Sequence, residues 1–104
     1  MARRTISATL LADILNYLNI TWTDTATEAK ITNIIQGGIA YLNGKYGGEA
    51  DYESDGLPRD LLFEYCQYRR DGALDVFENN YLSLILAMQH RKAVIEYAEM
   101  ESPE

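Results

Sequence analysis

The chain has 104 residues, of which 47% are hydrophobic and 24% charged, which is typical of one folded domain and not of a disordered chain. Sixteen acidic residues against nine basic ones give a net charge of −7, which disfavours nucleic-acid binding because that requires a basic face. No membrane partner is expected, since the apolar runs fall short of the roughly 18 residues that span a bilayer, and no signal peptide is expected after Arg3 and Arg4.

The first predicted helix runs from about Ser7 to Leu18. Ser7 is a good N-cap residue, and Asn19 is a reasonable place for the helix to stop. Apolar residues recur at the i, i+3, i+4 spacing of a core-facing helix: Leu10, Leu11, Ile14, Leu15 and Leu18.

A short joint, residues 18–24, leads into the second predicted helix, 25–43, which Gly44 is expected to end. Asp24 or Thr25 can serve as its N-cap, and Thr25-x-x-Glu28 fits a capping box. The helix carries a clear apolar stripe: Ile31, Ile34, Ile35, Ile39 and Leu42.

Two adjacent glycines, Gly37 and Gly38, interrupt this helix, where each costs about 1 kcal/mol relative to alanine. Gly38 lies on the apolar side, so we expect another helix to pack closely against it. A simple kink is the alternative.

Residues 44–57 are predicted to form a long acidic loop, because glycines and acids follow one another without periodicity. Asp51-x-Glu53-x-Asp55-Gly56 resembles the start of an EF-hand loop, but Leu62 replaces the required glutamate and Pro58 interrupts the motif. A calcium site is therefore not expected.

Pro58 suits the first turn of a third helix, residues 58–70, on whose apolar side Cys66 is expected to be a buried hydrophobic residue. Arg69 and Arg70 fit the end of this helix, where cations favour the helix dipole. Asp71-Gly72 then breaks the chain. A last helical region begins near Ala73, with Asn79-Asn80 as a second candidate break.

The sequence thus predicts an all-α fold: a small bundle of four to five helices in a single domain, 1–104. Whether residues 89–104 form an extended C-terminal segment stays open. The last helical region carries more large apolar groups than one small bundle needs. Its candidate interface residues for a neighbouring molecule are Phe77, Tyr81, Leu84, Ile85, Met88, Arg91 and Lys92.

No motif predicts catalysis. His90 has no histidine or cysteine partner nearby in the sequence, no P-loop is present, and no pair of carboxylates stands out as an acid–base pair. We therefore expect no enzyme, catalytic residue, cofactor or metal. Eight tyrosines instead favour either interfaces or the wet edge of the core.

The order of these features resembles the head–tail connector proteins of long-tailed phages. The joint 18–24 fits L-x-I-x-x-x-D, a capped helix and a Gly-rich loop follow, and residues 58–69 fit P-x-x-L-x-x-x-x-x-x-Y-R. Residues 72–81 resemble the next segment in members from firmicute phages. The similarity covers about 90 residues and weakens from Gln89 onward.

The resemblance implies a structural virion protein at the head–tail junction, assembled in the host cytoplasm. Subunits would form a ring, dodecameric in the virion, between the portal protein and the next neck or tail-completion protein. DNA would pass through the ring without specific binding, and negative charge in its lumen would repel phosphate.

Two other classes of protein remain open. One is a small acidic helical module that binds or regulates a protein partner, which a monomer or dimer with one dominant acidic face would indicate. The other is an enzyme of unfamiliar type, which would need a pocket holding perturbed carboxylates.

Overall fold

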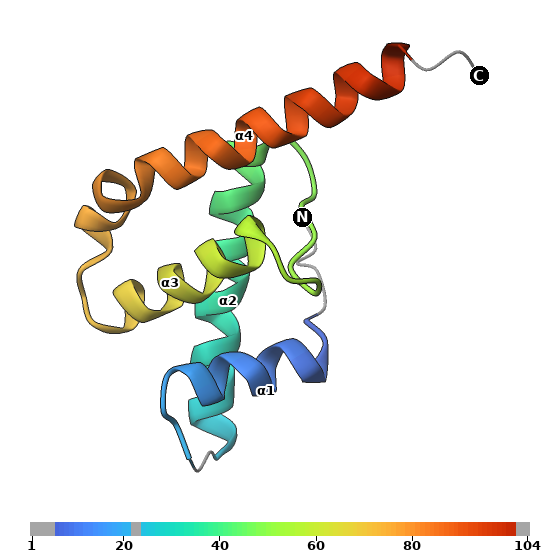
Figure 1. Ribbon diagram of the computed structural model, residues 1–104. Helices are drawn as coiled ribbons and strands as arrows, with labels where there is room; N and C mark the ends of the chain where they lie inside the picture. The colour runs from blue at the N-terminus through green and yellow to red at the C-terminus, as the bar shows by residue number, and fades with distance from the viewer. Residues whose placement is uncertain (1–5, 22–23, 102–104) are drawn as a thin grey trace.

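The computed structural model describes residues 6–21 and 24–101. The described residues contain helices and no strand. The elements in chain order are α1 (Ala8–Tyr17), α2 (Thr25–Tyr46), α3 (Leu57–Arg70), the short 3-10 helix η1 (Leu74–Val76) and α4 (Phe77–Glu101). Helix α4 lies across one end of α2, and α1 crosses the other end (Figure 1). The all-helical bundle predicted from the sequence is therefore confirmed.

The first helix begins and ends as its sequence predicts. The Ser7 hydroxyl accepts a hydrogen bond from the Leu10 amide at 3.0 Å. Asn19 follows the last turn with a φ of 62°, in the left-handed region that asparagine tolerates. The Ile20 amide then donates to the Leu15 carbonyl at 2.9 Å, a Schellman ending that satisfies an otherwise unpaired carbonyl.

Of the two candidate caps of α2, Asp24 is the N-cap and Thr25 is already helical. The Asp24 carboxylate accepts a hydrogen bond from the Thr27 amide at 2.7 Å, and this bond lowers the pKa of Asp24 below 3.8. Trp22 and Thr23 of the joint, like Arg3 and Arg4, lie outside the described residues.

The end of α2 corrects the prediction. The helix continues through Gly44 to Tyr46, and Gly47 terminates it in the left-handed region with a φ of 86°. Gly44 has open space around it, so a helix tolerates it there. The connection to α3 is consequently residues 47–56, shorter than the expected 44–57 loop.

Between α3 and α4 the chain turns at Gly72, whose φ is 73°. The Ala73 amide donates to the Tyr68 carbonyl at 2.8 Å, so α3 also has a Schellman ending. The candidate break at Asn79-Asn80 does not occur, because α4 runs unbroken from Phe77.

One core joins all four helices. A Cβ added at Gly38 would lie 2.7 Å from Tyr65 Cδ1 and 2.8 Å from Leu62 Cδ1, so α3 packs closely on α2 there, as the apolar stripe indicates. Cys66 is fully buried, and burial raises the pKa of its thiol to about 12. The largest fully buried side chains are Phe77, Ile14, Ile35, Leu42, Leu61, Leu62, Ile85 and Met88.

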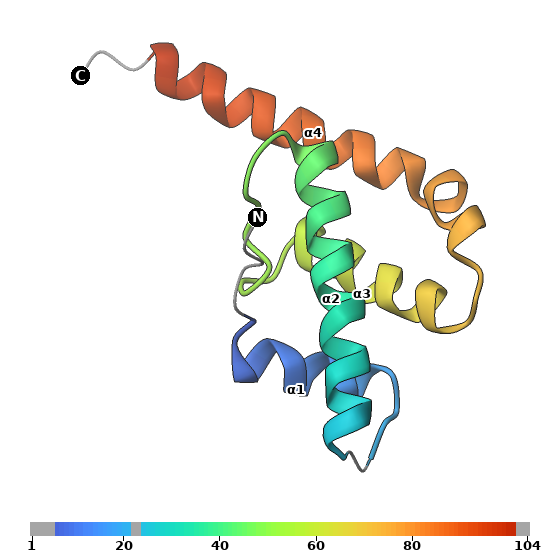
Figure 2. The same ribbon diagram turned by 180° about the vertical axis from the view of Figure 1, so that it is seen from behind.

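The molecule is elongated, with principal extents of 52 × 29 × 27 Å. Figures 1 and 2 show why: the C-terminal part of α4 continues past α2 and projects away from the other helices. The segment 89–104, whose extension the sequence left open, thus belongs to α4 as far as residue 101.

Candidate interaction surfaces

Three of the predicted interface residues serve the core instead. Phe77, Ile85 and Met88 are each at most 2% exposed. A partner cannot reach these side chains in the folded subunit, so their assignment to an interface is corrected. Periodicity marked them as apolar, and the bundle itself covers them.

The other four predicted interface residues are spread over different environments. Leu84 and Arg91 are exposed, whereas Tyr81 and Lys92 are half-buried. Tyr81 donates a hydrogen bond to Glu64 at 3.0 Å. Lys92 lies 5.4 Å from the centre of the Tyr46 ring and 2.7 Å from Glu96. The structure therefore does not gather the predicted set into one patch.

The most exposed apolar surface lies further along α4. Every side chain from 93 to 100 is exposed. We call residues 93–100 the α4 end. Its large apolar side chains are Val94, 52% exposed, Ile95, 56%, Tyr97, 63%, and Met100, 79%. Two helical turns that project with this much apolar surface are typical of an interaction site, because an isolated helix end is only marginally stable in water.

The outer side of α4 continues this exposed surface toward the bundle. Leu82 is 45% exposed and Leu86 is 52% exposed, one turn apart. The predicted interface set included Leu84 and Ile85 and left out both of these leucines. These two leucines and three later residues follow one another at steps of four, seven, four and three residues: Leu82, Leu86, Ala93, Tyr97 and Met100. This helical spacing could have identified the second stripe from the sequence.

Most tyrosines line the edge of the core, the second of the two interpretations that the sequence allowed. Phe77 is the centre of an aromatic cluster, and its ring centroid lies 5.2 Å from that of Tyr81 and 5.7 Å from those of Tyr65 and Tyr68. Such contacts add to the stabilisation from burial. Tyr97 is the exception, since it lies on the α4 end.

Glu64 of α3 ties two other helices together. Its carboxylate accepts hydrogen bonds from the hydroxyls of Tyr17, on α1, and Tyr81, on α4. Burial and the bond to Glu64 raise the pKa of Tyr17 to about 12 and also raise the pKa of Tyr81. Both phenols thus stay protonated at neutral pH and act as donors, which is a structural role.

The connection 47–56 is anchored more firmly than its glycines and acids indicate. Ala50 and Tyr52 are buried. The side-chain oxygen of Asn43 accepts hydrogen bonds from the Ala50 amide at 3.0 Å and from the Tyr52 hydroxyl at 2.7 Å. Because Asn43 belongs to the last turns of α2, these bonds hold the connection against that helix.

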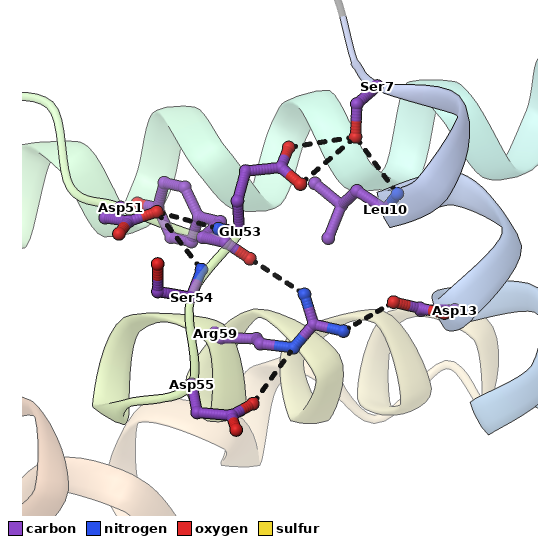
Figure 3. A network of polar contacts seen from close by, with 9 residues as sticks. Ser7, Leu10, Asp13, Asp51, Glu53, Ser54, Asp55 and Arg59 are labelled. Atoms are coloured by element: carbon purple, nitrogen blue, oxygen red, sulfur yellow. Dashed lines mark hydrogen bonds and ion pairs between the residues drawn. The ribbon is translucent and has the colours of Figure 1, made fainter.

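Arg59 adds a second anchor, which Figure 3 shows from close by. Its guanidinium donates to the Tyr52 carbonyl at 3.1 Å and to Asp13 of α1 at 2.7 Å. A further ion pair at 4.0 Å joins it to Asp55. The side chain of Arg59 therefore links α1, α3 and the connection.

The acids of the failed EF-hand motif point to separate partners in Figure 3. Asp51 accepts hydrogen bonds from the amides of Glu53 and Ser54, and Glu53 accepts one from Ser7 at 2.9 Å. Within residues 6–21 and 24–101, no group of three potential ligand residues could hold a metal ion. In the same part of the chain, no helix is long and apolar enough to cross a membrane.

One cavity among the described residues is basic, although the net charge of the chain is −7. It has a volume of about 580 Å³ and lies where residues 19–21, the first half of α2 and the end of α3 meet. Lys30, Arg69 and Arg70 line it beside Ile20, Ile31 and Ile34. We call this site the basic pocket. In the sequence, Arg69 and Arg70 fit only the role of helix-end charges.

The three cations of the basic pocket have no acidic partner among the described residues. Arg70 donates to the Leu18 carbonyl at 3.0 Å, which fixes its position, and Arg69 lies 3.5 Å from the Tyr65 hydroxyl. Cations that have no acidic partner in the described part of the chain, next to apolar side chains, suit a ligand with both an anionic and an apolar group.

No protein-family model, curated protein or solved structure matches the chain. The resemblance to phage connectors therefore remains a prediction.

Proposed function

We propose that this chain is a structural virion protein that forms the head–tail connector ring of a long-tailed phage, below the portal and around the DNA channel. The proposal combines the order of sequence features with one structural observation: α4 leaves the bundle and exposes several large apolar side chains at its end. In such a subunit, exposed apolar side chains are available to form an interface with a neighbouring subunit.

The α4 end is the part of the structure that is best suited to a subunit interface. Its exposed apolar side chains are of the kind that subunit interfaces bury. A ring requires a heterologous contact, in which one patch meets a different patch on the next subunit. A projecting helix end is suited to this, because it reaches beyond its own subunit.

The net charge of −7 fits a channel through which DNA passes. Carboxylates around a lumen repel phosphate and so keep the duplex from adhering to the wall. The same charge opposes crowding of subunits, so free subunits should associate weakly, and salt should favour assembly by screening the repulsion.

The test is to mix the purified chain with portal assemblies of its own phage, at low and moderate salt, and to image the particles by electron microscopy. We expect a symmetric ring on the portal that is more fully occupied at moderate salt. Tyr97→Asp should abolish the ring while leaving the melting temperature unchanged, because the side chain is exposed in the subunit. A folded chain that never associates with its portal would overturn the proposal.

The same experiment separates the connector from the alternative, an acidic helical module acting on one protein partner. That module would stay a monomer or dimer and bind its target in a small complex of fixed stoichiometry. A DNA titration supplies a second check, since micromolar duplex binding at physiological salt would contradict a passive channel wall.

A further inference from the structure

We propose that the α4 end of one copy of this chain binds in the basic pocket of the next copy. This inference rests on the proposed ring and deepens it by assigning the two patches that meet. It commits the pocket to one occupant, a second copy of this chain.

The two surfaces are complementary in charge. The pocket presents Lys30, Arg69 and Arg70 without an acidic partner among the described residues. The α4 end carries Glu96 and Glu99, and the sequence places further glutamates at 101 and 104. A contact between them removes like-charge crowding at both places, which a chain of net charge −7 needs in order to assemble.

They are also complementary in shape and polarity. The cavity of about 580 Å³ has the size of pockets that enclose several side chains, and isoleucines form its apolar part. Tyr97 and Met100 are the most exposed large apolar groups of the described residues. Burying an aromatic ring and a flexible thioether beside charge-paired arginines is a common composition for the centre of an interface.

A subunit cannot make this contact with itself. The pocket lies where residues 19–21, the first half of α2 and the end of α3 meet, whereas the α4 end projects from the opposite end of the molecule (Figures 1 and 2). The patches are therefore donor and acceptor on two different copies. Repeating such a heterologous contact generates a closed ring when the rotation between copies closes.

Disulfide trapping in full-length chains tests the contact directly. Met100→Cys places a thiol on the α4 end, and Thr27→Cys places one at the pocket, which Thr27 lines. The native Cys66 is buried, so it does not compete under mild oxidation. A matched control pairs Met100→Cys with Ser54→Cys, which is exposed on the 47–56 connection.

After assembly on the portal and oxidation, a chain with both Met100→Cys and Thr27→Cys should give a ladder of covalent oligomers on a non-reducing gel. A mixture of the two single variants should stop at dimers, because each copy then carries only one half of the contact. The control pair should give no covalent product. Rings on the portal without a product above that control would overturn the inference and leave the proposed function standing.

Charge reversal gives an independent readout. Lys30→Glu with Arg69→Glu, and separately Glu96→Lys with Glu99→Lys, should each raise the concentration for half-occupancy of the portal by about tenfold or more. The two pairs change net charge in opposite directions, so a shared loss cannot come from net charge. Combining all four changes should restore occupancy, and melting temperatures should show that each variant is folded.

The remaining outcomes are also decisive. Losses that the combined variant does not rescue would overturn the pairing of pocket and α4 end. Cross-linking in concentrated free protein, with no ring on the portal, would support the contact and overturn the connector function. If the experiment gives no rings and no cross-links, both the contact and the connector function are overturned.

Discussion

Both halves of α4 carry large apolar side chains, but only the first half buries some of them in the core. Residues 77–92 place Phe77, Ile85 and Met88 in the core, whereas residues 94–100 are exposed throughout. Apolar periodicity therefore indicates that a helix face is buried by something, without saying whether its own chain or another molecule covers it.

The boundary between the halves has a structural cause. Gln89 donates to the Lys45 carbonyl at 2.8 Å, and Lys92 lies over the Tyr46 ring, so α4 contacts the last turn of α2 up to that point. Gly47 then ends α2 and turns the chain away. The C-terminal part of α4 projects past the other described helices (Figure 1).

The largest expected effect is the difference in unfolding free energy between a substitution in the core half of α4 and one in its projecting half. Phe77→Ala should lower the free energy of unfolding by about 3–5 kcal/mol, because it leaves a cavity at the centre of the aromatic cluster. Ile95→Ala should change it by less than about 0.5 kcal/mol, since that side chain is 56% exposed on the projecting helix. Urea denaturation of both variants measures this. Comparable losses would mean that the α4 end belongs to the subunit's own core.

A second test concerns the contact that holds the core half together. Gly38→Leu should destabilise the chain by about 1–3 kcal/mol, because even a Cβ there would clash with Leu62 and Tyr65 of α3. Gly44→Ala is the matched control on the same helix. Open space surrounds Gly44, so alanine should stabilise by up to about 1 kcal/mol. A melting temperature for Gly38→Leu equal to that of the wild type would refute the close approach.

The smallest expected effect is the pH dependence of the stability that the Asp24 cap gives to α2, within the bundle. The Thr27 amide lowers the folded-state pKa of Asp24 below 3.8, so its charged cap stabilises α2 at neutral pH. This stabilisation is lost as the pH falls through the lowered pKa. Asp24→Ala should therefore reduce the melting temperature at neutral pH more than in strong acid, and Asp24→Asn, which keeps the acceptor, should reduce it less. An equal loss at both pH values would contradict the role of the charge.

Much of the fold could be predicted because local signals and packing agree. Ser7, Asp24, Asn19 and Gly72 mark helix ends by their own chemistry, and the stripe around Gly38 indicated the close contact with α3. The end of α2 was misplaced because Gly44 is tolerated inside a helix. The anchoring of 47–56 was missed because it depends on Asn43 and Arg59, whose partners are set by tertiary structure.

The interaction surfaces were harder to predict for a related reason. Within α4, Ile85 and Leu86 are neighbours in sequence, yet one is 1% exposed and the other 52%. Only the position of α2 and α3 decides which of them is covered. The basic pocket likewise brings Lys30 together with Arg69 and Arg70, which are distant in sequence.

Hydrogen exchange with residue resolution, on the free chain and on the chain bound to its portal, tests the central claim most directly. We expect amides of residues 77–92 to be protected in both states, because the core holds that half of α4. Amides of residues 93–100 should exchange rapidly in the free chain and become protected only after assembly. Strong protection of 93–100 in a confirmed monomer, or no gain of protection in the assembled ring, would contradict the account.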